Sequence, residues 1–124
     1  MEANELRVGN LIDFEGETCK VLSIDGQGVD VLFLGSGEEV WIDLFQFTPI
    51  PLTEEWLLKF GFNKQGNTIY KELNGFEFGT INTNRSKPRF YLQTQGSTSN
   101  ITLPIKFVHQ LQNLYFALTG EELT

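Results

Sequence analysis

The sequence predicts an α+β protein, with a small β-barrel over residues 1–52 and, over residues 53–124, a lobe of antiparallel strands between two helices. Short apolar segments separated by glycine-containing turns fill the first half, whereas helical spacing of apolar residues occurs only in the second. The charge changes at the same place. Residues 1–52 contain ten acidic and two basic residues (net −8), and residues 53–124 contain six acidic and seven basic ones (net +1).

The strands predicted in the first half are short and are joined by tight turns. We expect them over residues 10–14, 18–24, 29–34 and 39–44, with a helical turn at 43–46 and a fifth short strand at 47–50. A flat sheet of this size would expose one face and its edges, so closure into a barrel is expected. The order of turns resembles that of SH3-like barrels, which bind peptides, RNA or proteins or serve as spacers.

The second half is expected to begin and end with a helix. Thr53 is a suitable N-cap, Glu54 and Glu55 follow in the first turn, and Gly61 is a plausible stop. Strands are then predicted over 68–73, 76–81, 89–94 and 101–105. The last helix has an apolar stripe at helical spacing, formed by Phe107, Val108, Leu111, Leu114, Tyr115 and Leu118. We expect this helix to lie across the sheet of the second half, beside the first helix.

Composition excludes several classes of protein. The single cysteine, Cys19, excludes an intramolecular disulfide and is expected to be buried and inert. The start of the chain does not resemble a signal peptide, and no apolar run is long enough to span a bilayer, so we expect a cytoplasmic protein. The net charge of −7 opposes non-specific binding to nucleic acids and to anionic membranes.

No group of residues suggests catalysis. The only histidine, His109, falls on the last helix and is expected to be a surface or partly buried polar residue, and no pattern brings it to Cys19. Asp13, Glu15 and Glu17 alternate around a turn without the spacing of a calcium loop, so a solvated acidic turn is expected. We therefore expect a protein that is not an enzyme and needs no metal or cofactor.

An aromatic patch is the first candidate interaction site. If Val40 and Ile42 face the barrel core, then Trp41 faces away from it, and nearby Phe45 and Phe47 would extend the exposed surface. Exposed tryptophans are enriched at protein interfaces. The alternative is that Trp41 packs against the second half of the chain and makes the two halves one rigid body.

A basic loop is the second candidate. Arg85, Lys87 and Arg89 lie within five residues of one another, beside Tyr91. They could contact phosphates while Tyr91 stacks on a base, or they could meet an acidic partner, including the acidic half of another copy. A solvated loop is the simpler interpretation.

Three segments carry a family resemblance: residues 6–10 (LRVGN), 50–62 (IPLTEEWLLKFGF) and 108–123 (VHQLQNLYFALTGEEL). They resemble small proteins of unassigned function from phages, prophages and genomes of Bacteroidetes-type gut bacteria. The resemblance implies a cytoplasmic accessory protein of a mobile element, and it brings no activity, ligand or catalytic residue.

These observations predict a non-enzymatic interaction module, one that binds a protein partner. The alternatives are a nucleic-acid-associated protein that uses the basic loop at residues 85–89, and an acidic protein that imitates DNA. The sequence leaves the identity of the partner open.

Overall fold

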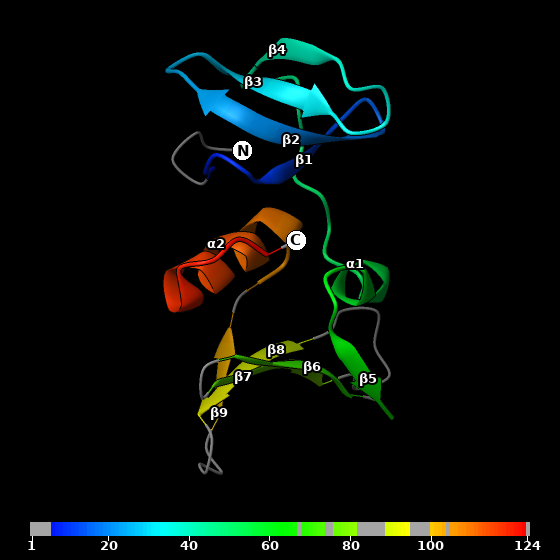
Figure 1. Cartoon of the computed structure of the whole chain (residues 1–124), viewed down its shortest axis with the longest axis vertical. Coiled ribbons are helices and arrows are strands. Elements are labelled where there is room, and N and C mark those ends of the chain that lie inside the picture. The colour runs from blue at the N-terminus through cyan, green and yellow to red at the C-terminus, as the bar shows by residue number, and fades with distance from the viewer. Residues whose placement is uncertain are drawn as a thin grey trace. The chain divides into compact units, whose positions relative to one another are not determined.

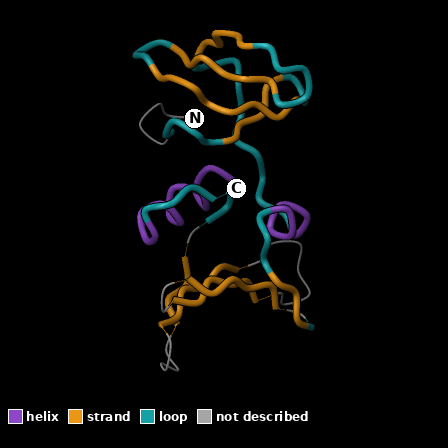
Figure 2. The backbone as a smooth tube through the Cα atoms, viewed as in Figure 1, coloured by secondary structure: helices purple, strands orange, loops and turns teal. Residues whose placement is uncertain are grey.

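The computed structural model describes residues 6–66, 68–73, 76–81, 89–94, 100–103 and 105–123. They form two compact units, each of which contains one antiparallel sheet and one helix (Figures 1 and 2). The first unit contains Met1–Pro51 together with Phe107–Leu123, and the second contains Leu52–Lys106. The predicted α+β class is confirmed.

The sheet of the first unit is open. Its strands are β1 (Leu11–Phe14), β2 (Glu17–Ile24), β3 (Gly28–Phe33) and β4 (Glu39–Asp43), in the order β1-β2-β3-β4. The closed barrel that we predicted is not confirmed, because the segment after β4 contributes a single bridged pair instead of a fifth strand. In that pair Asp13 N donates to Thr48 O and Thr48 N donates to Asp13 O, both at 2.9 Å.

Alternation along the strands builds the core of the first unit. Successive side chains point to opposite faces of a sheet, so every second residue can be buried. The buried set is Leu6, Ile12, Cys19, Val21, Val29, Val31, Ile42 and Phe47. The rings of Phe14 and Phe33 stack at the margin of this core, with centroids 6.0 Å apart. The burial of Cys19 agrees with its predicted role as a core residue.

The C-terminal helix α2 (Val108–Thr119) belongs to the first unit. We expected it to lie on the sheet of the second half, and the structure differs. The chain leaves the first unit at Pro51 and returns at Phe107, and these two residues form a bridged pair. Val108 N donates to Ile50 O at 2.9 Å beside that bridge. The apolar stripe of α2 predicted a buried face, but it did not identify the surface that covers it.

Buried amides specify where α2 packs. Gln112 Oε1 accepts a hydrogen bond from Leu11 N at 2.8 Å, and Gln112 Nε2 donates to Gly9 O at 3.3 Å. Asn10 Nδ2 donates to Asn113 Oδ1 at 2.8 Å. Asn10 and Gln112 are buried, and buried polar groups are costly unless they are hydrogen-bonded. These bonds therefore favour one position of the helix against the start of β1.

An ion pair closes the same contact at its edge. The Arg7 guanidinium donates to both carboxylate oxygens of Glu122, at 2.6 and 3.2 Å, and lies 4.1 Å from the centroid of the Phe116 ring. Gly9 has a positive φ of 97°, which residues with a side chain rarely adopt. The left-handed turn at Gly9 thus lets the chain carry Arg7 and Asn10 onto the helix.

The second unit follows its predicted order with one additional strand. Its elements are α1 (Glu54–Lys59), β5 (Asn63–Gln65), β6 (Thr68–Leu73), β7 (Phe76–Ile81), β8 (Arg89–Thr94) and β9 (Asn100–Leu103). The sheet has the order β5-β6-β7-β8-β9, with every pair antiparallel. The unpredicted strand, β5, consists of three exposed polar residues and so lacks an apolar pattern.

Both predicted ends of α1 are confirmed. Thr53 caps the helix, and its Oγ1 accepts from Trp56 N at 3.4 Å. Gly61 follows the helix with a positive φ of 85°. In the described part of the chain, neither helix has the length and apolar character needed to cross a bilayer.

The position of α2 leads to a prediction about stability. Replacing Gln112 with Ala leaves the backbone N–H of Leu11 and the C=O of Gly9 without their side-chain partners. Leaving a buried polar group unsatisfied costs about 1–3 kcal/mol. We expect Gln112→Ala to lower the free energy of unfolding by about that amount, measured by urea denaturation and circular dichroism. Gln27→Ala, which removes an exposed amide, should change it by less than about 0.5 kcal/mol. Equal losses in the two variants would contradict this role for Gln112.

Candidate interaction surface

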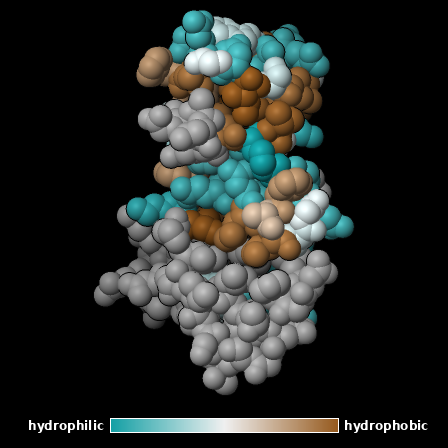
Figure 3. All heavy atoms as spheres, turned by 90° about the vertical axis from the view of Figure 1, so that its left-hand side faces the viewer, coloured by the Kyte–Doolittle hydropathy of each residue, from teal (hydrophilic) through white to brown (hydrophobic). Residues whose placement is uncertain are grey.

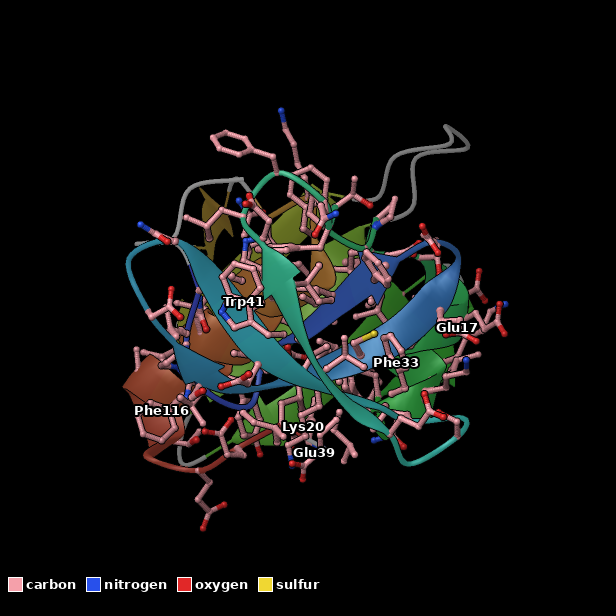
Figure 4. All side chains as sticks on the ribbon, turned by 90° about the horizontal axis from the view of Figure 1, so that it is seen from above. Glu17, Lys20, Phe33, Glu39, Trp41 and Phe116 are labelled. Atoms are coloured by element: carbon pink, nitrogen blue, oxygen red, sulfur yellow. The ribbon has the colours of Figure 1, made fainter. Side chains whose placement is uncertain are left out.

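Trp41 lies on the outer face of the first unit's sheet. In β4, Ile42 enters the core, so Glu39, Trp41 and Asp43 point to the opposite face. Trp41 is 46% exposed, and its side chain is visible beside β4 in Figure 4. The expectation that Trp41 faces away from the core agrees with this placement.

Gly28 makes room for the indole. A Cβ atom at Gly28 would collide with the indole ring of Trp41 and with the backbone oxygen of Ile42. Gly28 and Asp43 are register partners across β3 and β4, two residues from the pairing of Asp30 with Trp41. The ring can therefore lie against the backbone of β3 only because residue 28 has no side chain.

Asp25 holds the edge of the ring. Trp41 Nε1 donates to Asp25 Oδ2 at 2.9 Å, while Asp25 Oδ1 accepts from the backbone N–H groups of Gln27 and Gly28, each at 2.7 Å. Hydrogen bonds to a carboxylate stabilise its charged form. These three hydrogen bonds lower the pKa of Asp25 below its usual value. The bond from Gln27 contributes most, and those from Trp41 and Gly28 contribute less. An ionised carboxylate thus orients the indole at neutral pH.

A second carboxylate lies on the same face of the sheet as Trp41. Asp30 is the register partner of Trp41 across β3 and β4, and directly opposite residues have Cβ atoms about 4.5–5.5 Å apart. Asp30 Oδ2 accepts from Ser23 Oγ at 2.7 Å, which orients this carboxylate as well. The exposed indole therefore shares its face of the sheet with two oriented carboxylates, one of which, Asp25, it contacts.

Phe45 extends this end of the sheet. It follows β4 in a tight turn and is 96% exposed. Asp43 Oδ1 accepts from Phe45 N at 3.0 Å, and Leu44 N donates to Gln27 O at 3.1 Å. The second bond joins the Phe45 turn to the Asp25 turn. We define the Trp41 surface as Asp25, Asp30, Trp41, Asp43 and Phe45.

Hydrophobic side chains at the surface of the first unit are not confined to this end. Among the described residues of this unit, the exposed large ones are Val8, Leu34, Val40, Trp41, Phe45 and Phe116. Figure 3 shows one face of the molecule, on which hydrophobic residues of the first unit reach the surface among hydrophilic ones. What distinguishes the Trp41 surface is that its aromatic groups share one end of the sheet with three carboxylates.

Charge is divided unevenly between the two units. The first unit contains twelve acidic and two basic residues, a net charge of −10, and the second contains four acidic and seven basic residues, a net charge of +3. Arg7 is paired with Glu122. Lys20 is the one basic residue in β1–β4, and it shares a cross-strand row with Leu32 and Glu39 (Figure 4). No basic residue belongs to the Trp41 surface.

The other predicted interaction residues fall in different places. Phe47 is 3% exposed and packs in the core, so it does not extend the patch as we expected; the chain turns inward just before the bridge at Thr48. Tyr91 is also buried, with its ring over Gly79, and burial, followed by the charges of Glu77 and Tyr70, raises its pKa.

The basic cluster itself is described only in part. Arg85 and Lys87 lie outside the described residues, and Arg89 is the first residue of β8. A buried Tyr91 cannot present a ring face for stacking on a base, so the stacking half of that hypothesis is withdrawn.

The thiol of Cys19 and the imidazole of His109 are both buried and do not belong to this surface. Cys19 is fully buried, and its burial, followed by the charges of Glu17 and Asp13, raises the pKa of the thiol to about 11. His109 is 1% exposed, more deeply buried than we expected, and its ring stacks on Phe107 with centroids 5.9 Å apart. Among the described residues, no group of three or more histidine, cysteine, aspartate or glutamate side chains could hold a metal ion.

Comparisons of the chain with protein-family models, with curated proteins and with solved structures find no match. The interpretation of the surface therefore depends on its own geometry. Sequence reasoning identified Trp41 and Phe45 but missed Asp25, Gly28 and Asp30. The available signal was Asp25-Gly26-Gln27-Gly28, which lies between the strands expected over 18–24 and 29–34 and was interpreted only as one of the tight turns.

The Asp25–Trp41 bond makes the surface sensitive to acid. Because the pKa of Asp25 is lowered in the folded chain, the bond should persist at neutral pH and be lost as the pH falls through that lowered pKa. We expect the NMR resonance of the Trp41 indole N–H to titrate with a midpoint below about 3.9, the usual aspartate value. Asp25→Asn should remove this transition, whereas Asp30→Asn should leave it. A midpoint at or above the usual value would contradict the assignment.

Burial of Cys19 leads to a prediction about reactivity. A thiol whose pKa is raised to about 11 carries almost no thiolate at neutral pH, and the thiolate is the reactive form. We expect a chromogenic disulfide reagent to leave the native protein unlabelled and to label the urea-unfolded protein completely, followed by absorbance. Rapid labelling of the native protein would show that the thiol is accessible.

Proposed function

We propose that the chain is a non-enzymatic interaction protein that binds a basic protein segment through the Trp41 surface. The observation that carries this proposal is an exposed indole, held in place by Asp25 and Gly28 and paired in register with Asp30, in a unit with a net charge of −10. The orienting contacts matter because a side chain that is already ordered loses less conformational freedom on binding.

The chemistry of this surface suits cationic side chains. The face of an indole attracts a guanidinium or ammonium group, and carboxylates pair with the same groups. Tryptophan is also among the residues that contribute most to binding at protein interfaces. An arginine or lysine above Trp41 would have Asp30 beside it, while the exposed Phe45 could cover the aliphatic part of a neighbouring side chain.

The same charge disfavours phosphates at this surface. Binding to nucleic acid depends on neutralisation of phosphates by Lys and Arg, and the first unit has two such residues against twelve acidic ones. A DNA-imitating role would require a DNA-binding protein as the basic partner, so it is a special case of the present proposal.

The finer assignments from sequence also belong to this proposal. The Asp13–Thr48 bridge after β4 suits an SH3-like roll that is not fully closed, and we assign the first unit to that class as part of the hypothesis. The resemblance to small phage, prophage and Bacteroidetes proteins supports a cytoplasmic accessory protein of a mobile element.

Binding of an arginine-rich peptide tests the proposal. We expect isothermal titration calorimetry to detect binding that weakens as salt is added, because exposed charge pairs are screened. Trp41→Ala and Phe45→Ser should each weaken it by about tenfold or more, which corresponds to about 1.4 kcal/mol. Phe45 is 96% exposed, so its replacement should leave the fold intact.

The matched control is Leu34→Ser. Leu34 is also exposed, but it lies just after β3, at the end of that strand away from Gly28. This variant should bind as the parent chain does. Absence of binding to the peptide, or equal weakening by Leu34→Ser, would contradict the proposal, and tighter binding to duplex DNA than to the peptide would favour the nucleic-acid alternative.

A further inference from the structure

β4 is an edge strand. It is the last strand in the order β1-β2-β3-β4, and no described strand lies on its outer side. The opposite edge differs, because Thr48 bridges to Asp13 of β1 there. An edge strand presents unpaired backbone N–H and C=O groups to which another chain can add.

The register shows which groups of β4 point outward. Hydrogen-bonded and non-hydrogen-bonded pairs alternate in an antiparallel ladder. Phe33 N donates to Glu38 O at 2.8 Å and Leu44 N donates to Gln27 O at 3.1 Å, so residues 38, 40, 42 and 44 face β3. The backbone groups of Glu39, Trp41 and Asp43 therefore point away from the sheet.

Asp43 is already engaged on that side. Its N–H donates to Gln46 Oε1 at 3.1 Å, and its C=O accepts from Gln46 N at 3.0 Å. The outward groups that remain for another strand belong to Glu39 and Trp41. Both residues also present side chains on the outer face, so the open edge and the Trp41 surface are continuous.

The negative charge of β4 favours a basic strand over a second copy of this chain. If two copies paired β4 to β4 in antiparallel register around Trp41, Glu39 of each copy would lie opposite Asp43 of the other. Like charges directly opposite each other destabilise a pair of strands. A second copy is therefore disfavoured, whereas a strand with arginine or lysine at those positions gains opposite-charge pairs.

We propose that the basic partner binds in an extended conformation, as an added antiparallel strand on the outer edge of β4. This inference rests on the proposed function, because it names the binding mode of the same surface. Backbone bonds to Glu39 and Trp41 align the segment, and alternate side chains then lie on the Trp41 face. In the partner strand, basic residues lie opposite Glu39 and Asp43, on the Trp41 face. The partner residues whose side chains point to the other face are small or apolar.

A pair of protein variants tests this mode. Proline is tolerated on an edge strand where its missing N–H would face solvent. Glu39→Pro removes an outward N–H and a charge, whereas Glu39→Gln removes the charge alone. With a peptide in which arginine alternates with valine, we expect Glu39→Pro to bind at least about tenfold more weakly than Glu39→Gln. Circular dichroism of both free variants verifies that the fold is retained.

Peptide variants give a measurement that does not depend on the folding of a mutant. N-methylation removes a single backbone donor from the peptide. In an added strand, the N–H groups of alternate peptide residues point toward β4. Methylation of these N–H groups should abolish binding, whereas methylation of the N–H groups that point away from β4 should leave the affinity unchanged. Intermolecular nuclear Overhauser effects between the peptide and the β4 backbone should accompany binding.

The outcomes separate the two proposals. If the arginine peptide binds and depends on Trp41, but neither pattern of N-methylation nor Glu39→Pro affects it, strand addition is overturned and the proposed function stands. If the peptide does not bind the parent chain, both fail. A dimer in sedimentation experiments that Glu39→Pro dissociates would place a second copy on this edge and would also overturn the inference.

Discussion

The buried hydrogen bonds of Gln112 are the interaction on which the first unit depends. They join the C-terminal helix to the backbone at Gly9 and Leu11, more than a hundred residues earlier in the chain. Both ends of the chain thus build one unit, and the second unit is inserted between Pro51 and Phe107. A buried amide needs all its partners in place, so this contact favours a single arrangement more strongly than an apolar stripe would.

This arrangement leaves one edge and one face of the sheet for a partner. At the β1 edge, Thr48 forms a bridged pair with Asp13. The start of β1 is hydrogen-bonded to Gln112 of α2. The β4 edge and the Trp41 face have no comparable cover among the described elements. The negative charge of the acidic residues there has two consequences. It opposes pairing between copies, and it favours a partner of positive charge.

Local patterns were predictable from the sequence, and long-range packing was not. Alternation around Ile42 predicted the outward Trp41, and the capping residue Thr53 predicted the start of α1. Phe47 was misplaced because its burial depends on the bridge at Thr48, a contact with β1 over thirty residues away. The packing of α2 depends on Gln112, which a helical pattern assigns to the polar side. The sequence predicted a turn at Asp25, but the hydrogen bond from Trp41 to Asp25 depends on the register between β3 and β4.

Of the three segments noted in the sequence, residues 6–10 and 108–123 belong to the first unit, whereas residues 50–62 lie mostly in the second. Arg7 and Asn10, in the first segment, contact Glu122 and Asn113 in the last, and Ile50, which begins the middle segment, bonds to Val108. The Trp41 surface lies between residues 25 and 45, outside all three. The contact between the two ends of the chain is therefore separate in sequence from the Trp41 surface. The partner must therefore be identified from Trp41, Phe45 and the carboxylates around them.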